Sequence, residues 1–271
     1  MVSRLLLLAP LWLVSMISLA GAEGLRVLAA GSLREVMGEI GERYKEATAT
    51  TVTAEFGPSG LLRERVEKGE HADLFASADM GHPLKLLRDD RATRVAMFTR
   101  NALCGVAVPK VRLTTANFLD RLLDPAVKLG TSTPKADPAG DYTWTMFRRA
   151  DALRPGSYEI LSGKAQQIVG GPSNNAPVDG QDPAVAALAA GRVDIVIGYC
   201  TSARLRLSQM AELQVAAVPG EIAAGPEYGL AVLKGADPRA TDLALFMLSP
   251  DGQQIFSRFG FAPVGLPKPE R

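Results

Sequence analysis

Hydrophobic and polar positions follow a repeated pattern along this chain, in which a short apolar run is followed by a stretch with helical spacing. The first example begins with LRVLAA at residues 25–30. After it, apolar side chains recur every three or four positions, at Leu33, Val36, Met37, Ile40 and Tyr44. A short apolar run is typical of a buried strand, and the longer spacing is typical of an amphipathic helix. The pattern therefore predicts a strand followed by a helix.

The same pattern continues to residue 78. TVTAEF at 51–56 predicts a second strand, and a helix is expected from about Ser59, with Leu62 and Val66 on its inner side. DLFASA at 73–78 predicts a third strand. Strands that alternate with helices at this spacing are typical of right-handed crossovers and of a parallel sheet covered on both faces. The first unit is thus predicted to be α/β.

A second α/β unit is predicted to begin with the strand ALCGVAVPK at 102–110. The expected elements of this unit are strands near 126–131 and at 193–200 and helices at 142–153 and 182–191. EYGLAVLK at 227–234 predicts a strand that returns to the first unit, followed by two terminal helices separated at Pro250.

Two crossings of the chain therefore join two predicted parallel-sheet lobes. Lobe 1 comprises residues 23–104 and 230–271, and lobe 2 comprises residues 105–229. The turn-rich stretch at 169–182 is expected to be a surface excursion. Two lobes joined in this way leave a cleft between them, which is the usual place for a ligand.

Residues 1–22 are expected to be a cleaved secretory signal rather than part of the fold. Arg4 supplies a basic start, residues 5–20 form an apolar core, and Ala20-Gly21-Ala22 offers small residues before Glu23. This apolar core is too short and wrongly flanked for a stable membrane span. The sequence therefore predicts an exported protein.

Charge and cysteine content narrow the possible partners. Of 30 basic and 29 acidic residues, only Arg4 falls in the predicted signal, which leaves 29 of each and a net charge of zero. Zero charge argues against nucleic acid or an anionic membrane as the main partner. Cys104 and Cys200 are too far apart for the usual zinc or thioredoxin motifs. In an oxidising compartment they are expected to be either one disulfide or two buried thiols.

Two strand-to-helix junctions carry serines that could act on a ligand. Ser32, with Glu35 three residues later, matches a capping box, whereas Ser59 is followed by Leu62 at that position. The carboxyl ends of parallel strands meet at one edge of a sheet, so both helix N-termini are expected to open onto that edge. Two such ends form an anion site without Lys or Arg. The alternative is that both serines only cap helices.

An enzyme reading has little support in the sequence. His71 and His82 lie in polar, turn-like contexts and are expected to be solvated surface residues. No nucleophile elbow, HExxH motif or phosphate-cradling GxxxxGK motif is present. We interpret Asp137, Asp141 and Asp194 as turn residues rather than metal ligands.

Five segments, in this order, resemble motifs of the periplasmic molybdate-binding proteins of bacterial ABC transporters, which belong to the type 2 periplasmic binding protein superfamily. They are LAAGSL, FGPSGLLRERVEKGEHADLFASAD, STPKADPAGDY, GRVDIVIGYCTSA and FSRFGF. The chain departs from the family pattern at Gly31, where alanine is usual, at Gly60, where serine or threonine is frequent, and at Gly198, where valine usually precedes the tyrosine.

The resemblance implies a two-lobed fold and a tetrahedral oxyanion, molybdate or tungstate, as ligand, with no cofactor. It also implies a periplasmic monomer that delivers its ligand to a membrane permease. The ligand would be held by the hydroxyls and backbone N–H groups of Ser32 and Ser59, the phenol of Tyr199 and the backbone N–H of Ala139. Counting back without gaps adds a backbone N–H at Gln181, where the motif itself does not match.

Hydrogen-bond donors alone, with no carboxylate acceptor, would reject a protonated anion such as hydrogen phosphate. Sulfate is fully ionised as well, so only cavity size could exclude it. Three alternatives stay open at this stage. They are a binding protein for an organic anion or for ferric iron, an exported hydrolase with Ser32 or Ser59 as its nucleophile, and a purely structural exported domain.

Overall fold

The apolar run at residues 25–30 becomes an interior strand of a six-stranded sheet with the order β11-β4-β10-β3-β1-β2. The computed structural model describes residues 24–171 and 181–265. The strands of this first sheet are β1 (Leu25–Ala30), β2 (Val52–Gly57), β3 (Leu74–Ser77), β4 (Ala92–Arg100), β10 (Glu227–Leu233) and β11 (Ala262–Pro263). Its helices are η1 (Gly31–Leu33), α1 (Arg34–Thr48), α2 (Ser59–Glu67), α3 (Gly81–Arg88), α9 (Arg239–Leu248) and α10 (Pro250–Arg258).

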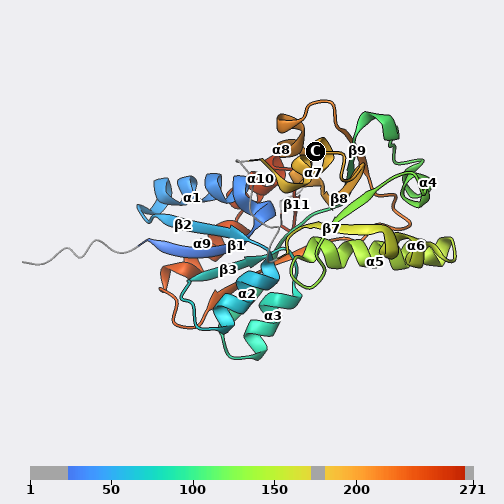
Figure 1. Ribbon diagram of the computed structural model, residues 1–271. Coiled ribbons are helices and arrows are strands. Elements are labelled where there is room, and N and C mark those ends of the chain that lie inside the picture. Colours follow the sequence, from blue (N-terminus) through green and yellow to red (C-terminus); the bar gives the residue numbers. More distant parts are fainter. Residues whose placement is uncertain (1–23, 172–180, 266–271) are drawn as a thin grey trace, which may run out of the picture.

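The second lobe is built on a five-stranded sheet with the order β7-β6-β8-β5-β9. Its strands are β5 (Leu103–Ala107), β6 (Leu129–Ser132), β7 (Ala165–Val169), β8 (Ile195–Tyr199) and β9 (Gln214–Ala217). Its helices are η2 (Pro109–Val111), α4 (Phe118–Leu123), α5 (Pro138–Leu153), α6 (Ser157–Lys164), α7 (Pro183–Ala189) and α8 (Cys200–Gln209). Figure 1 shows the two lobes side by side, with α1 on one face of the first sheet and α2 and α3 on the other.

The two-lobed α/β prediction is confirmed, but the sheets are mixed rather than parallel. β1 pairs in parallel with β2 and β3, as expected. β10 runs antiparallel to β3 and β4, and β5 runs antiparallel to β8 and β9. Both antiparallel strands are the ones that the chain enters from the other lobe, so neither is preceded by the helical crossover that parallel pairing requires.

The chain passes between the sheets twice. It leaves the first sheet after Arg100 and enters the second at Leu103, and it returns between Ala217 and Glu227. The predicted lobe boundaries placed these crossings at 104/105 and 229/230. The predicted signal at 1–22 lies outside the described residues, as does most of the predicted excursion at 169–182. Within the described ranges, no helix combines the length and the apolar character needed to cross a membrane.

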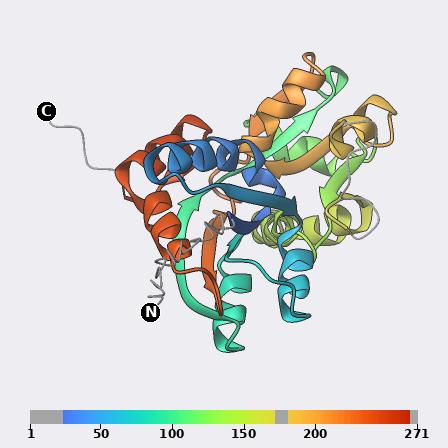
Figure 2. The same ribbon diagram turned by 90° about the vertical axis from the view of Figure 1, so that its left-hand side faces the viewer.

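The predicted inner face of the first helix is confirmed. Leu33, Val36, Met37, Ile40 and Tyr44 are all buried against the first sheet and the terminal helices. Tyr44 packs on Phe246 of α9 with their ring centroids 5.6 Å apart, and Figure 2 shows the terminal helices beside α1. Truncation of one large buried aliphatic side chain on this face is expected to destabilise the fold by about 2–5 kcal/mol.

A disulfide joins Cys104 of β5 to Cys200, the first residue of α8, with the two Cα atoms 4.9 Å apart. The register explains this proximity, because Leu103 lies opposite Tyr199 in the antiparallel β5–β8 pair. Of the two alternatives left open by the sequence, the structure shows the bridge. It attaches the start of α8 to the sheet that α8 follows.

Candidate functional site

A cavity of about 380 Å³ lies between the lobes. Its wall includes the last residues of four strands, Ala30 of β1, Gly57 of β2, Ser132 of β6 and Tyr199 of β8. Four of the five predicted site residues also line it: Ser32, Ser59, Ala139 and Tyr199. The expectation that the serine-bearing helix ends open onto one sheet edge is therefore confirmed.

Ser32 does not cap a helix. It lies inside the short 3₁₀ turn η1, and neither η1 nor α1 has a side-chain hydrogen bond at its N-cap. The capping-box prediction is wrong because this extra turn moves the N-cap of α1 to Leu33. The Ser32 Oγ instead lies 2.8 Å from the Tyr228 hydroxyl, which belongs to β10 in the same lobe.

The Tyr228 hydroxyl can donate to Ser32 Oγ, and the hydrogen of Ser32 is then free for a ligand. Tyr228 Oη accepts a hydrogen bond from Asn101 Nδ2 at 3.0 Å, so its own hydrogen can be donated to Ser32 Oγ. The amide orientation of Asn101 is supported by its Oδ1, which accepts from the backbone N–H of Ala102. Asn101 Nδ2 also donates to Thr201 Oγ1 at 2.8 Å, which links this network to α8 of the second lobe.

Ser59 is oriented by the same principle. It is the first residue of α2, is almost completely buried, and its Oγ accepts from the backbone N–H of Ala78 at 3.1 Å. Because the protein occupies a lone pair of the oxygen, the hydroxyl hydrogen can be directed at the cavity. Both first-lobe serines can therefore donate a hydrogen bond to a ligand while they keep their protein partners.

Ala139 has a protein partner that the sequence did not indicate. Its backbone N–H donates to Asp137 Oδ1 at 3.1 Å, because Asp137 is the N-cap of α5. Asp137 lines the cavity, as do Glu35 and Asp182. The expectation of a site without carboxylates is therefore wrong. Burial raises the pKa of Asp137 above its ordinary value, and the hydrogen bond from Ala139 opposes this shift.

Tyr199 ends β8 with its ring packed edge-on against Tyr228, with centroids 5.6 Å apart. Its side chain is buried, and its hydroxyl, although near that of Tyr228, makes no hydrogen bond of good geometry in the described part of the chain. Burial raises the pKa of Tyr199 well above its usual range, so the phenol is a neutral donor. An unsatisfied buried hydroxyl destabilises a fold by about 1–3 kcal/mol, and a ligand acceptor would remove that penalty.

Gln181 is the one predicted site residue that is not among the described residues lining the cavity. It is half-buried, and the next residue, Asp182, reaches the wall. Asp182 caps α7 by accepting from the backbone N–H groups of Ala184 and Val185. The backbone position that counting assigned to Gln181 therefore lies beside the wall.

Arg34, which is exposed, and Arg206 both line the cavity, and the sequence pointed to neither. Arg206 is the buried one. It lies on α8, is only 5 % exposed, and lines the cavity. Its Nε donates to Asp182 Oδ1 at 3.3 Å. The expected site contained no Lys or Arg, so this is a correction. No apolar pattern pointed to it, because Arg206 itself occupies a buried position of α8, three residues after Ala203.

The two histidines lie away from this wall. His71 is exposed, as predicted, but His82 of α3 is half-buried rather than solvated. Its Nε2 lies 3.8 Å from Asp79 Oδ2 and its Nδ1 lies 3.4 Å from Arg63 Nη1. Burial lowers the pKa of His82. Across the described residues, no group of His, Cys, Asp and Glu side chains could hold a metal ion.

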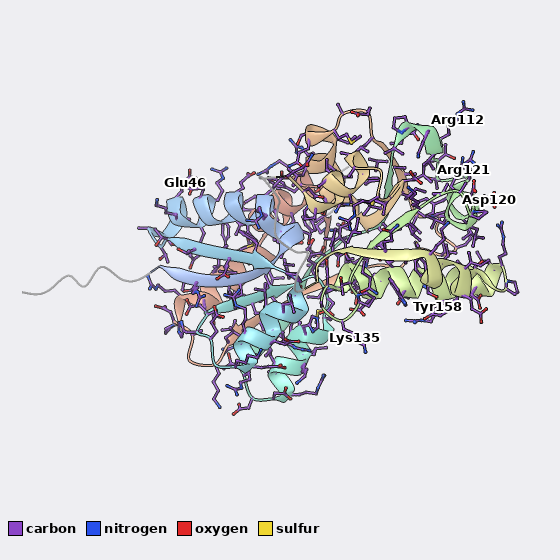
Figure 3. All side chains as sticks on the ribbon, in the orientation of Figure 1. Glu46, Arg112, Asp120, Arg121, Lys135 and Tyr158 are labelled. Atoms are coloured by element: carbon purple, nitrogen blue, oxygen red, sulfur yellow. A yellow bond between two sulfur atoms is a disulfide. The ribbon has the colours of Figure 1, made fainter. Side chains whose placement is uncertain are left out.

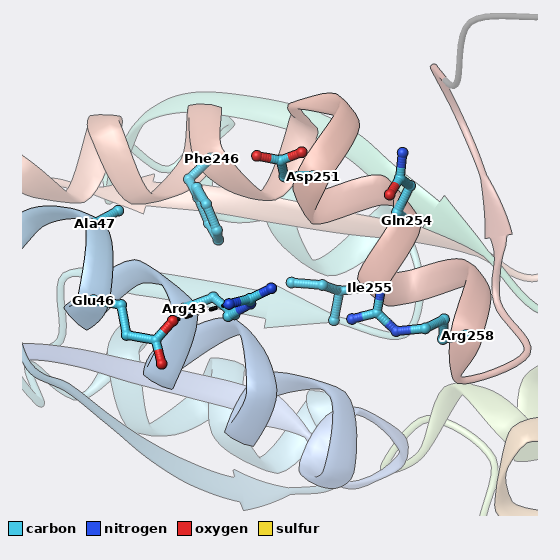
Figure 4. Close-up of a pocket in the computed structure, with 8 residues that line it drawn as sticks. All are labelled: Arg43, Glu46, Ala47, Phe246, Asp251, Gln254, Ile255 and Arg258. Carbon is cyan, nitrogen blue, oxygen red and sulfur yellow. Dashed lines mark hydrogen bonds and ion pairs between the residues drawn. The ribbon is translucent and has the colours of Figure 1, made fainter.

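A second hollow of about 370 Å³ lies on the outer side of the first lobe, between α1 and the terminal helices. Figure 4 shows Arg43 beside Glu46 on α1, with Asp251 and Arg258 on α10. Arg43 pairs with Glu46, and Arg258 pairs with Glu39. Every residue of this wall belongs to one lobe, and both arginines already have acidic partners, so we do not assign a ligand to it.

The chain belongs to the family of bacterial extracellular solute-binding proteins, whose family model matches residues 25–262. An uncharacterized protein of Pasteurella multocida is 35% identical over 241 residues, which cover 89% of this chain and 99% of that protein. The molybdate-binding protein ModA of Escherichia coli is 28% identical over 255 residues, which cover 90% of this chain and 91% of ModA.

Among solved structures, the sulfate-binding protein SubI of Mycobacterium tuberculosis matches with a TM-score of 0.74 and 15% sequence identity. The match covers 89% of this chain and 87% of SubI. At this level of identity the likeness shows the shared two-lobed fold.

Proposed function

We propose that this chain is the periplasmic solute-binding component of an ABC importer and that it binds a tetrahedral oxyanion, molybdate or tungstate, between its lobes. The observation that carries the proposal is the set of hydroxyl donors around one cavity. Ser32 and Ser59 can each donate to a ligand while they keep their protein partners, and the buried Tyr199 hydroxyl makes no hydrogen bond of good geometry within the described chain. Hydrogen bonds to a charged acceptor contribute about 1.5–3 kcal/mol each.

The choice of molybdate is supported by the full-length similarity to ModA, whereas the similarity to the sulfate-binding protein is one of fold. In this proposal the protein needs no cofactor, works as a monomer and delivers its ligand to a membrane permease.

The hydrolase alternative lacks support, because neither His71 nor His82 is among the described residues that line the cavity. Ferric iron also lacks support, since the described residues offer no metal-binding cluster.

Calorimetric titration of the purified protein with molybdate, tungstate, sulfate and phosphate tests this proposal. We expect saturable binding of molybdate and tungstate, with each raising the melting temperature by mass action. Much weaker binding of sulfate and phosphate is expected. Equal affinity for sulfate would contradict selection by size, and binding of none of the four anions would overturn the proposal.

A further inference from the structure

The guanidinium of Arg206 is buried at the cavity with part of its hydrogen-bonding capacity unused. One hydrogen bond, from Nε to Asp182 Oδ1, is formed. Nη1 has no hydrogen-bond partner in the described residues. A guanidinium carries five N–H donors, and buried polar groups in native proteins are normally satisfied. A buried cation with an open donor therefore indicates a partner that binds beside it.

Gly198 provides an independent observation of the same space. A Cβ atom at position 198 would lie 2.9 Å from Arg206 Nη1. Cβ atoms do not come this close to other heavy atoms, so the guanidinium would have to shift. Gly198 is not among the described glycines with positive φ, so its backbone conformation does not require glycine. Its lack of a side chain instead leaves room for the guanidinium.

Two carboxylates lie near the guanidinium, but they do not use all of its N–H donors. Asp182 is fixed as the N-cap of α7, so its carboxylate can orient Arg206 through Nε. Asp137 lies near enough for the Arg206 charge to lower its pKa, although burial, the larger cause, raises it. Neither carboxylate makes a hydrogen bond to Nη1. The open donor thus belongs to a cation that is anchored on one side only.

We propose that Arg206 is an anion-binding residue of this cavity, whose Nη1 donates a charge-assisted hydrogen bond to the bound oxyanion. This inference rests on the proposed function and adds one charged donor to the neutral set. Arg206 and Gly198 both line the cavity, so an anion bound beside Gly198 would meet Nη1. Asp182 positions the guanidinium through Nε, and the missing side chain at Gly198 leaves room for it.

The test compares molybdate affinity by calorimetry in the wild-type protein and in the Arg206→Gln, Gly198→Ala and Arg204→Gln variants. Arg204 lies on the same helix but is exposed, so Arg204→Gln is the matched control for loss of one positive charge. We expect Arg206→Gln to weaken binding about ten- to a hundredfold, the effect of one hydrogen bond to a charged group. Gly198→Ala keeps the charge but displaces Nη1, and should weaken binding about threefold or more.

Unfolding curves without anion separate folding from binding. If Arg206→Gln does not fold, the Gly198→Ala variant decides, since it retains the ion pair with Asp182. Unchanged molybdate affinity in the folded Arg206→Gln variant, or in Gly198→Ala when that variant decides, would overturn the role of Arg206 while leaving the proposed function in place. If the wild-type protein binds no oxyanion at all, the proposed function fails and this inference falls with it.

Discussion

On the first-lobe side of the cavity, the hydroxyls of Ser32 and Ser59 each have a protein partner. On the second-lobe side, Tyr199 Oη and Arg206 Nη1 have none in the part of the chain described. The first side is therefore organised before any ligand arrives. The second side carries an energetic penalty that a ligand would relieve, so the two sides should respond differently to the same kind of substitution.

The largest expected effect concerns the disulfide that holds the second-lobe side together. Cys104 and Cys200 are 96 residues apart in sequence, and a bridge that closes a loop of this length typically stabilises a fold by about 2–5 kcal/mol. The Cys104→Ala/Cys200→Ala variant should lose that amount in urea unfolding. Addition of a reductant should lower the wild-type stability but leave the variant unchanged. Two free thiols in the denatured, unreduced wild-type protein would contradict the bridge.

Hydroxyl deletions on the two sides provide the sharpest contrast. Ser59→Ala should weaken molybdate binding about ten- to a hundredfold and should also destabilise the free protein by about 1–3 kcal/mol, because the N–H of Ala78 loses its acceptor. Tyr199→Phe should weaken binding similarly without destabilising the free protein, since its hydroxyl has no partner within the described residues.

Titration calorimetry and thermal unfolding of both variants measure this contrast. Tyr158→Phe is the control, because Tyr158 lies on α6, away from the lobe junction (Figure 3). A Tyr199→Phe protein that loses stability but keeps its affinity would contradict the proposed difference between the two sides of the cavity. Ser32→Ala should behave like Ser59→Ala in binding. If it lowers only stability, Ser32 has a structural role alone.

A third prediction concerns the contact between the two sides. The backbone N–H of Gly60 donates to the carbonyl of Ala136 at 2.9 Å, and a Cβ at position 60 would lie 2.3 Å from the carbonyl oxygen of Lys135. Figure 3 shows Lys135 where the two lobes meet. Backbone atoms cannot move aside at little cost, so Gly60→Ala should hold the lobes apart and weaken anion binding about tenfold.

Gly38→Ala is the matched control for this substitution, because a Cβ there meets no atom within 4 Å. It should leave binding unchanged in calorimetric titration. Wild-type affinity in Gly60→Ala would show that closure of the lobes does not depend on this contact.

The smallest effect is expected from Asp137, the carboxylate beside the proposed anion. Its pKa is raised by burial, so its contribution to stability is greatest below the unfolded-state pKa and is lost as the pH rises through the folded-state value. Ionisation also repels an anion, so wild-type affinity should fall over the same pH range. Asp137→Asn keeps an acceptor for the N–H of Ala139, and should raise neutral-pH affinity a few-fold.

Titrations of the wild-type and Asp137→Asn proteins from acidic to neutral pH check this effect. The Asp137→Asn profile should be flatter, and its free form should be more stable at neutral pH. An affinity that falls in Asp137→Asn would mean that the ionised carboxylate assists binding.

Local sequence patterns were enough to predict most of the elements of both lobes. Apolar runs such as LRVLAA and helical spacing such as that from Leu33 to Tyr44 are local signals, because they depend on which face of an element is buried. Eight strands and α-helices of the described residues were not predicted, namely β4, β7, β9, β11, α3, α4, α6 and α8, and β4 and α8 show one reason. β4 carries exposed Arg94 and Arg100, and the buried positions of α8 include Arg206, so neither presents a clean apolar pattern.

Strand direction is not encoded in that local signal and depends on how the lobes are assembled. An apolar run looks the same whether its neighbour is parallel or antiparallel. The directions of β5 and β10, the strands that the chain enters from the other lobe, could therefore not be predicted from sequence. Family resemblance and the serine-headed junctions did indicate four residues that line the cavity, Ser32, Ser59, Ala139 and Tyr199.

The state of each polar group at the cavity was decided by contacts between distant parts of the chain. Ser32 hydrogen-bonds a tyrosine 196 positions away instead of capping a helix, and this leaves its hydroxyl on the cavity wall. Asp182 binds Arg206 from another helix, and Gly198 leaves the space that the guanidinium fills. A sequence pattern specifies which face of a helix or strand is buried, but whether a buried donor has a partner depends on the packing of elements that the chain brings together only when it folds.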